Sequence, residues 1–393
     1  MAIKTKTKFF LIIFGFLCLI GLNYYFFGSK DRAKSEESIS FNLTDKLNEQ
    51  QNFKDSSSSS DEFVNNAAVE TQENPAPVIF DPHNSSPISG LNCPENKDRR
   101  PIAVMLAADK RVRPLSGVSQ ADLVIEMPVI TSMVTRLMAV YVCNSPDEIG
   151  SIRSARHDYI TLAKGLDAIL AHWGGSHFAL DYLKNEQTLD NLDALSNPYN
   201  AFYRKQGISR PDNGFTSYQR LYEAASKMGY RMENQFLGYP HRNESPLEKR
   251  GGKGVLTVGF SGWFRVEYTY DPVTNTYLRK WGEREDVDKT SNERIAPKNI
   301  VVMFAESRQI EGQYNDVEIE GQGEMHAYME GRVFKGIWRK EKGDCVIGDQ
   351  YVCLNDKPLL FFKQDGQELE FIPGQIWIEI LQPGQVLRWK NIE

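Results

Sequence analysis

An uncharged apolar run near the N-terminus constrains the fold most, because it removes the first thirty residues from any globular core. Phe9–Phe27 contains 19 residues and follows Lys4, Lys6 and Lys8. A helix needs about 20 apolar residues to cross the hydrocarbon of a bilayer, and a basic flank favours a cytoplasmic N-terminus. Residues 1–30 are therefore predicted to form a cytoplasmic stub and a single plasma-membrane anchor, with the body of the protein outside.

Two other fates of this segment compete with an uncleaved anchor. A cleaved secretory signal needs small residues where the apolar stretch ends, whereas this run ends in the bulky sequence Asn23–Phe27. Lipid attachment at Cys18 would need a small residue just before it, and Leu17 occupies that position. The sequence favours the uncleaved anchor, with Tyr24 and Tyr25 at the outer membrane interface.

Residues 31–78 are predicted to be a disordered linker. They contain ten Asp or Glu, four Lys or Arg, and five consecutive serines at Ser56–Ser60. Such a segment buries too little apolar surface to offset the entropy lost on ordering. Its excess of six negative charges equals the net charge of −6 of the whole chain, so the rest is near neutral. No nucleic-acid partner is expected, because that would call for a basic face.

The remaining residues predict two folded domains of different character. In residues 79–250 apolar strands alternate with helices, which is typical of an α/β layered domain. The expected strands are 102–106, 123–127, 137–142 and 168–173, and the expected helices are 154–164, 177–184 and 218–228. In residues 251–393 short alternating runs separated by turns predict a mostly antiparallel β domain. Gly251, Gly252 and Gly254 mark the boundary.

Four cysteines lie in the predicted external part, and an even number in an oxidising compartment indicates disulfides. Sequence alone allows three pairings; we expect Cys93 with Cys143 and Cys345 with Cys353, the latter across a hairpin. A zinc site is the alternative, but the chain lacks the close cysteine pairs that zinc sites use. We therefore expect no metal and no cofactor.

The run IGSIRSARHDY, residues 149–159, is the first candidate site. Arg153 and Arg156 flank Ser154, which is expected to cap a helix. The N-terminus of a helix favours anions, and guanidinium groups donate forked hydrogen bonds to carboxylate or phosphate. Asp158 could orient one arginine. The alternative is that both arginines pair with internal acids such as Glu126.

Two further loops could face the same cleft. In AHWGGS, Gly174 and Gly175 follow an expected strand and Ser176 begins the next helix, so their N–H groups could bind an anion. In RPDNGFTS, Arg210 and Asn213 precede another helix. The alternatives are a tight turn for the first loop and a solvated loop for the second.

At this point the chain resembles a known family. RPIAVML, RPLSGVSQADLVIE, TRLMAVY, IGSIRSAR, HWGGS and RPDNGFTS occur in the order seen in the YerB-like family, and PKNIVVM, GRVFKGIWRK and PGQIWIEIL resemble its second domain. The resemblance covers residues 90–390 and implies bacterial, membrane-attached extracytoplasmic proteins without an assigned activity. Many relatives carry Pro-His-Asn where this chain has Pro211-Asp212-Asn213, which places a histidine-dependent reaction at this loop in doubt.

The residues favour a protein that binds a phosphate or carboxylate of a cell-wall component. A hydrolase or transferase is the first alternative, with Asp158, His172 or Glu126 as the acid or base, although His172 fits a structural role better and no catalytic motif is present. The second is an interaction scaffold for another envelope protein, which would present the three tryptophans Trp263, Trp281 or Trp338.

Overall fold

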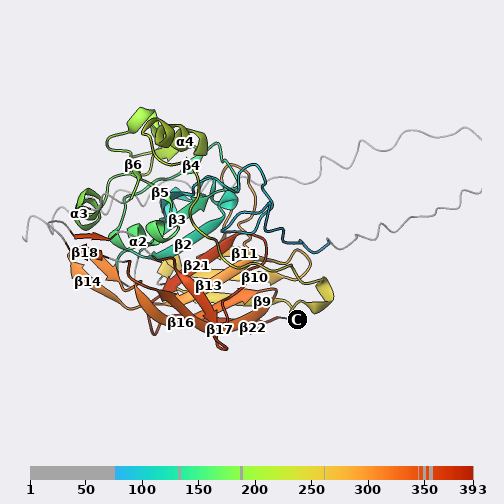
Figure 1. Cartoon of the computed structure of the whole chain (residues 1–393). Coiled ribbons are helices and arrows are strands. Elements are labelled where there is room, and N and C mark those ends of the chain that lie inside the picture. Colours follow the sequence, from blue (N-terminus) through green and yellow to red (C-terminus); the bar gives the residue numbers. More distant parts are fainter. Residues whose placement is uncertain are drawn as a thin grey trace, which may run out of the picture. The chain divides into compact units, whose positions relative to one another are not determined.

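The computed structural model describes residues 76–131, 134–185, 189–260, 262–343, 345–347, 351–353 and 357–392. These residues belong to one compact unit, which is drawn in colour in Figure 1. The predicted anchor Phe9–Phe27 and residues 31–75 of the predicted linker lie outside the described residues. Within the described ranges, none of the helices has the length and apolar character needed to cross a membrane.

A ten-stranded sheet forms the centre of the unit. From edge to edge its strands are β20 (Leu360–Lys363), β17 (Arg332–Lys340), β16 (Gly321–Met329), β13 (Asn299–Phe304), β21 (Ile376–Leu381), β2 (Leu123–Pro128), β3 (Thr135–Tyr141), β1 (Ile102–Ala107), β5 (Ile169–His172) and β6 (Asn191–Asp193). Strands β1, β2, β3 and β21 are buried along their whole length, as apolar strands covered on both faces should be. Strands β2 and β21 run parallel side by side (Figure 1), so sequence from both sides of residue 250 shares this sheet.

A second sheet has five antiparallel strands. Its order is β12 (Arg284–Glu285), β11 (Thr276–Trp281), β10 (Val266–Asp271), β9 (Gly254–Gly259) and β22 (Val386–Asn391). Burial alternates along β10 and β11, because one side of each strand faces the core. Smaller sheets are formed by β14 (Ser307–Glu311) with β15 (Tyr314–Val317), by β18 (Cys345–Ile347) with β19 (Tyr351–Cys353), and by β4 (Ile149–Gly150), β8 (Gly214–Thr216) and β7 (Tyr203–Arg204).

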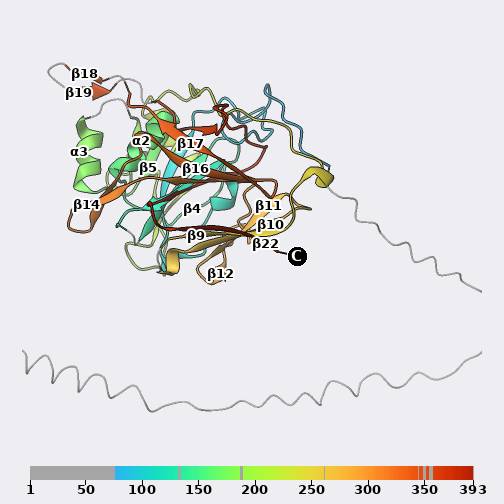
Figure 2. The same cartoon turned by 90° about the horizontal axis from the view of Figure 1, so that it is seen from below.

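Three α-helices occur in the described ranges, which are otherwise mostly β: α2 (His157–Gly165), α3 (His177–Asn185) and α4 (Tyr218–Lys227). Helices α2 and α3 lie together in Figure 2 and belong to an apolar cluster on one face of the central sheet. Helix α4 and the five-stranded sheet belong to a second cluster. Neighbouring residues of β1 alternate between the two: Met105 packs in the first cluster and Val104 in the second.

The structure corrects one helix boundary and confirms another. Helix α2 begins at His157 rather than at residue 154, and Arg156 takes the N-cap position that was expected of Ser154. The reason is that the preceding segment is extended and pairs with the end of β1 through Ile152. Helix α4 begins as predicted, since the side chain of Ser217 accepts a hydrogen bond from the N–H of Arg220.

The predicted disulfide between Cys93 and Cys143 is present, with an S–S distance of 2.01 Å. The predicted hairpin of β18 and β19 is also present, and it places Cys345 opposite Cys353. The side chains of those two residues lie outside what the structure describes, so their disulfide stays a prediction.

Candidate functional site

The segment 151–155 lies between the ends of two parallel strands, β1 and β5. The N–H of Ala107, the last residue of β1, donates to the carbonyl oxygen of Ser151 (3.0 Å), and the N–H of Trp173, just after β5, donates to that of Arg153 (3.0 Å). This edge holds the carboxyl ends of parallel strands, where ligands of α/β sheets commonly bind.

Arg136 brings a buried charge to the same edge. It is the second residue of β3, which runs antiparallel to β1, and it pairs with Ala107 at the end of β1. The side chain is buried, and its Nη1 donates to the carbonyl oxygen of Ser154 (2.8 Å). Its Nε is buried without a hydrogen-bond partner. Sequence analysis missed Arg136; the available signal was a charged residue inside an otherwise apolar strand.

Arg153 is neutralised by acids. It forms an ion pair with Asp212, and a second carboxylate, that of Asp109, lies 3.7 Å from its Nη2. Asp212 is also 3.8 Å from Nε of the exposed Arg111. The RPDNG loop therefore reaches this site through Asp212 and not through the predicted Arg210 or Asn213.

Arg156 lies at the N-cap of α2 and is half-buried. Its Nη1 donates to the carbonyl oxygen of Ala155 (2.9 Å), and its guanidinium lies 5.5 Å from the ring centre of Tyr314. Its Nε is buried without a partner, and burial lowers its pKa. Among the described residues, neither Arg156 nor Arg136 forms an ion pair with a carboxylate.

We call Arg136, Arg153 and Arg156 the arginine cluster. Burial, followed by the neighbouring charges of Arg156 and Arg153, lowers the pKa of Arg136 to about 9. The cluster sets three guanidiniums against the two carboxylates of Asp109 and Asp212, which leaves a formal charge of +1. Such an excess in a poorly solvated place favours an anion.

Ser151 brings another buried polar atom to the segment that carries Arg153. Its side chain is 2% exposed, and its Oγ is buried with no hydrogen-bond partner. A hydroxyl can donate to an anion oxygen. Ser151 was not among the predicted site residues, although it belongs to the same sequence run.

Two N–H groups of the glycine loop already have partners within the protein. The N–H of Gly174 donates to the carboxylate of Asp193 (2.8 Å), and the N–H of Ser176 donates to the carbonyl oxygen of Ala155 (3.2 Å). Gly175 pairs with Ala155 as in a strand. These bonds fix the segment that carries Arg153 and Arg156.

Asn213 is linked to Trp173 through Arg204. The side-chain oxygen of Asn213 accepts from Nη1 of Arg204 (2.6 Å), whose guanidinium lies 4.1 Å from the ring centre of Trp173. Arg210 is exposed. Among the described contacts, none joins Arg210 or Asn213 to the arginine cluster.

Two of the three catalytic candidates have structural partners. The ring of the buried His172 lies between the carbonyl oxygen of Gly174 (2.8 Å) and the side-chain oxygen of Asn191 (3.2 Å). Glu126 is fully buried and pairs with Arg279. Both residues therefore hold the fold together.

Asp158 differs, because burial raises its pKa well above its ordinary value and the nearby charge of Asp316 adds to the rise. Nε2 of His157 lies 3.2 Å from a carboxylate oxygen of each aspartate. In the described residues, these three side chains form a grouping that could hold a metal ion. However, Arg308 already pairs with Asp316 (2.8 Å), so a cation would compete with a guanidinium.

Of the three tryptophans that an interaction scaffold would expose, two are buried. Trp263 is 51% exposed, whereas Trp281 and Trp338 are 4% and 2% exposed. The prediction was wrong for these two because their rings fill the core: Trp281 packs edge-on against Phe264, and Nε1 of Trp338 donates to the carbonyl oxygen of Phe304 (2.8 Å).

Comparisons with known proteins cover most of the described chain. Residues 88–231 match the N-terminal domain, and residues 256–378 the C-terminal domain, of a protein family of unknown function (DUF3048). "Putative lipoprotein YerB" of Bacillus subtilis (strain 168) is 28% identical over 300 residues, which are 75% of this chain and 86% of the relative. The crystal structure of the YerB protein from Bacillus subtilis matches with a TM-score of 0.67 and 27% identity, covering 78% of this chain and 99% of that chain.

The comparison corrects the predicted localisation. The relative is named a lipoprotein, and lipoproteins are held at a membrane by lipid chains rather than by a spanning helix. The prediction of a single-pass plasma-membrane protein with a cytoplasmic N-terminus is therefore wrong. It depended on the length of one apolar run and on the residues around it, and these do not by themselves show how a chain is attached.

Proposed function

Because the chain belongs to the DUF3048 family of proteins of unknown function, we propose from its own site that it binds an anionic group of a cell-envelope component. The anionic group is a phosphate or a carboxylate, and it binds at the arginine cluster. The observation that carries the proposal is Arg136, a buried guanidinium that forms no ion pair among the described residues. A buried charge without a partner is costly, and a bound anion would remove that cost.

Three further features support this function. The Nε atoms of Arg136 and Arg156 and the Oγ of Ser151 are buried without partners, and all three can donate to an oxygen. The first turn of α2 follows Arg156 and adds the positive end of a helix dipole. Arg153 is already paired with Asp212, so its role is to hold the segment 151–156 in place.

The envelope location has its own support. A disulfide joins Cys93 to Cys143, and disulfides persist in oxidising compartments. The lipoprotein name of the Bacillus subtilis relative agrees with an envelope location. A polymer of the cell wall that carries phosphate or carboxylate groups is the partner that fits both the location and the charge.

The test measures binding of the full chain to inorganic phosphate, to acetate and to isolated cell-wall material. Replacing Arg136 or Arg156 by Gln should weaken binding about tenfold or more, because each removes a charge-assisted hydrogen-bond donor. Arg388→Gln is the control, since Arg388 is exposed on β22. Unchanged affinity in both single variants would rule out the cluster as the binding site.

A second candidate function is acid–base catalysis on the same polymer, and Asp158 favours it. A carboxyl whose pKa is raised well above its ordinary value holds its proton more tightly than usual and can act as a general acid. Asp158→Asn should then stop the release of soluble wall fragments while phosphate binding persists. If wild-type protein releases no fragments from wall material, catalysis is ruled out and only the binding function remains.

A further inference from the structure

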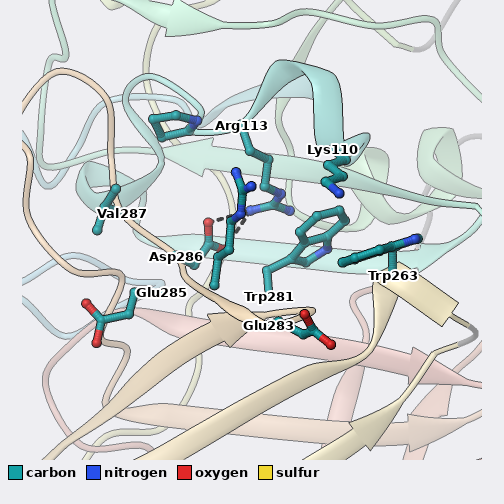
Figure 3. A pocket seen from close by; sticks show the side chains of 10 residues that line it. Lys110, Arg113, Trp263, Trp281, Glu283, Glu285, Asp286 and Val287 are labelled. Atoms are coloured by element: carbon teal, nitrogen blue, oxygen red, sulfur yellow. Dashed lines mark hydrogen bonds and ion pairs between the residues drawn. The ribbon is translucent and has the colours of Figure 1, made fainter. Parts of the chain in front are cut away.

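A pocket of about 90 Å³ lies between η1 (Lys110–Val112) and the five-stranded sheet. Figure 3 shows two indole rings, Trp263 and Trp281, with the cations Lys110 and Arg113 above and beside them. Sites for small molecules commonly combine aromatic walls with a few polar groups. We call this the tryptophan pocket. It shares no lining residue with the arginine cluster.

The pocket holds buried donors that lack acceptors. Trp281 is 4% exposed, and its Nε1 is buried without a partner. Nη1 of Arg113 donates to both carboxylate oxygens of Asp286 at 2.6 Å, but its Nε and Nη2 are buried without partners. Because a buried donor left unsatisfied costs free energy, these atoms favour a ligand that presents acceptor oxygens.

The charges that line the pocket cancel. Three basic side chains face three acidic ones: Lys110, Arg113 and Arg284, and Glu283, Glu285 and Asp286. A balanced lining gives no net attraction for an anion or a cation. It therefore differs from the arginine cluster, whose guanidiniums outnumber the carboxylates beside them.

The remaining surface is aromatic. Trp263 is 51% exposed, and Nζ of Lys110 lies 3.8 Å from its ring centre. Arg113 lies 4.6 Å from the ring centre of Trp281. An indole buries apolar C–H groups favourably, while the cations and Glu283 can bond to hydroxyl groups at the edges.

We propose that the tryptophan pocket binds an uncharged saccharide. A pyranose ring offers an apolar C–H face to the exposed indole of Trp263, acceptor oxygens to the N–H groups of Trp281 and Arg113, and hydroxyl donors to Glu283. This goes beyond the proposed binding of an anion, because the pocket, its charge and its ligand class are all different.

The experiment titrates the full chain with a tetramer of β-1,4-linked N-acetylglucosamine and follows tryptophan fluorescence and heat of binding. The chain is kept in a polyoxyethylene detergent, which carries no sugar. We expect saturable binding that Trp263→Ala weakens about tenfold. Trp281→Phe keeps an aromatic ring but removes the indole N–H, so it should weaken binding by a smaller factor.

Two control variants separate binding in the tryptophan pocket from binding elsewhere on the protein. Trp389→Phe changes a tryptophan of β22 that bonds to Asn391 and should leave affinity unchanged, as should Arg136→Gln in the arginine cluster. The proposal fails if the tetramer and maltotetraose both fail to bind at millimolar concentration. It also fails if Trp263→Ala and Trp281→Phe bind as wild type, or if an oligogalacturonate binds and the neutral sugars do not.

Discussion

At the scale of single residues, the buried charge of Arg136 destabilises the folded protein without serving a structural need. Arg136 is the second residue of the buried strand β3. Its hydrogen-bond partner is a neutral group, the carbonyl of Ser154. The two nearby guanidiniums, Arg153 and Arg156, make its charge less favourable still. A residue that served the fold alone would be more stable as an uncharged side chain, which is why this position points to a ligand.

Arg136→Gln should therefore raise the free energy of unfolding by about 1 kcal/mol or more in a buffer without polyvalent anions. Glutamine keeps a donor for the carbonyl oxygen of Ser154 but brings no charge. Added phosphate should raise the melting temperature of the wild type and have little effect on the variant, because a ligand stabilises the state that binds it. Thermal unfolding with and without phosphate measures both effects, and a variant less stable than wild type in both buffers would contradict them.

At the scale of elements, the sequence correctly predicted strands, helices and turns that depend on neighbouring residues. The strand 102–106, the start of the helix at residue 218 and the hairpin between Cys345 and Cys353 depend on neighbouring residues, and the structure has them. The start of α2 was misplaced because residues 151–155 pair with β1 and with the glycine loop. Such pairing overrides a local capping signal, and a single sequence does not reveal it.

The cap of α4 gives a prediction at this scale. Ser217→Ala removes the hydroxyl that accepts from the N–H of Arg220 and should lower the free energy of unfolding by about 1 kcal/mol. Ser226→Ala is the matched control, because Ser226 is exposed near the other end of the same helix and should change stability by less than about 0.5 kcal/mol. Urea unfolding measures the difference, and equal losses in the two variants would show that the hydroxyl does not cap the helix.

At the scale of the whole molecule, a buried charge network joins the two sheets. Arg279 on β11 forms ion pairs with Glu126 on β2 and with Asp286, and Glu379 on β21 lies 3.8 Å away. Arg113 also pairs with Asp286. Local pattern could not predict this network, because its members are far apart in sequence and each looks like an ordinary surface charge until β2, β11 and β21 come together.

The network holds three carboxyl groups and two guanidiniums, so one carboxyl group is left without a balancing charge. Burial, with the nearby carboxylate of Glu126, raises the pKa of Glu379 to about 8. In the unfolded chain this glutamate ionises near its ordinary value of 4.5. Between these two values the folded protein holds a proton that the unfolded chain has lost, so Glu379 makes stability fall as pH rises.

Glu379→Gln should remove this fall, because glutamine resembles the protonated acid and does not ionise. The variant and the wild type should be similarly stable near pH 5, and the variant should gain relative to wild type by at most about 1.4 kcal/mol per pH unit up to pH 8. Other buried acids, such as Asp158, titrate in both proteins and cancel in the difference. Urea unfolding at several pH values measures this difference in the free energy of unfolding, and the exposed Glu370→Gln is the control. Parallel pH profiles for wild type and Glu379→Gln would show that Glu379 is already ionised in the folded protein.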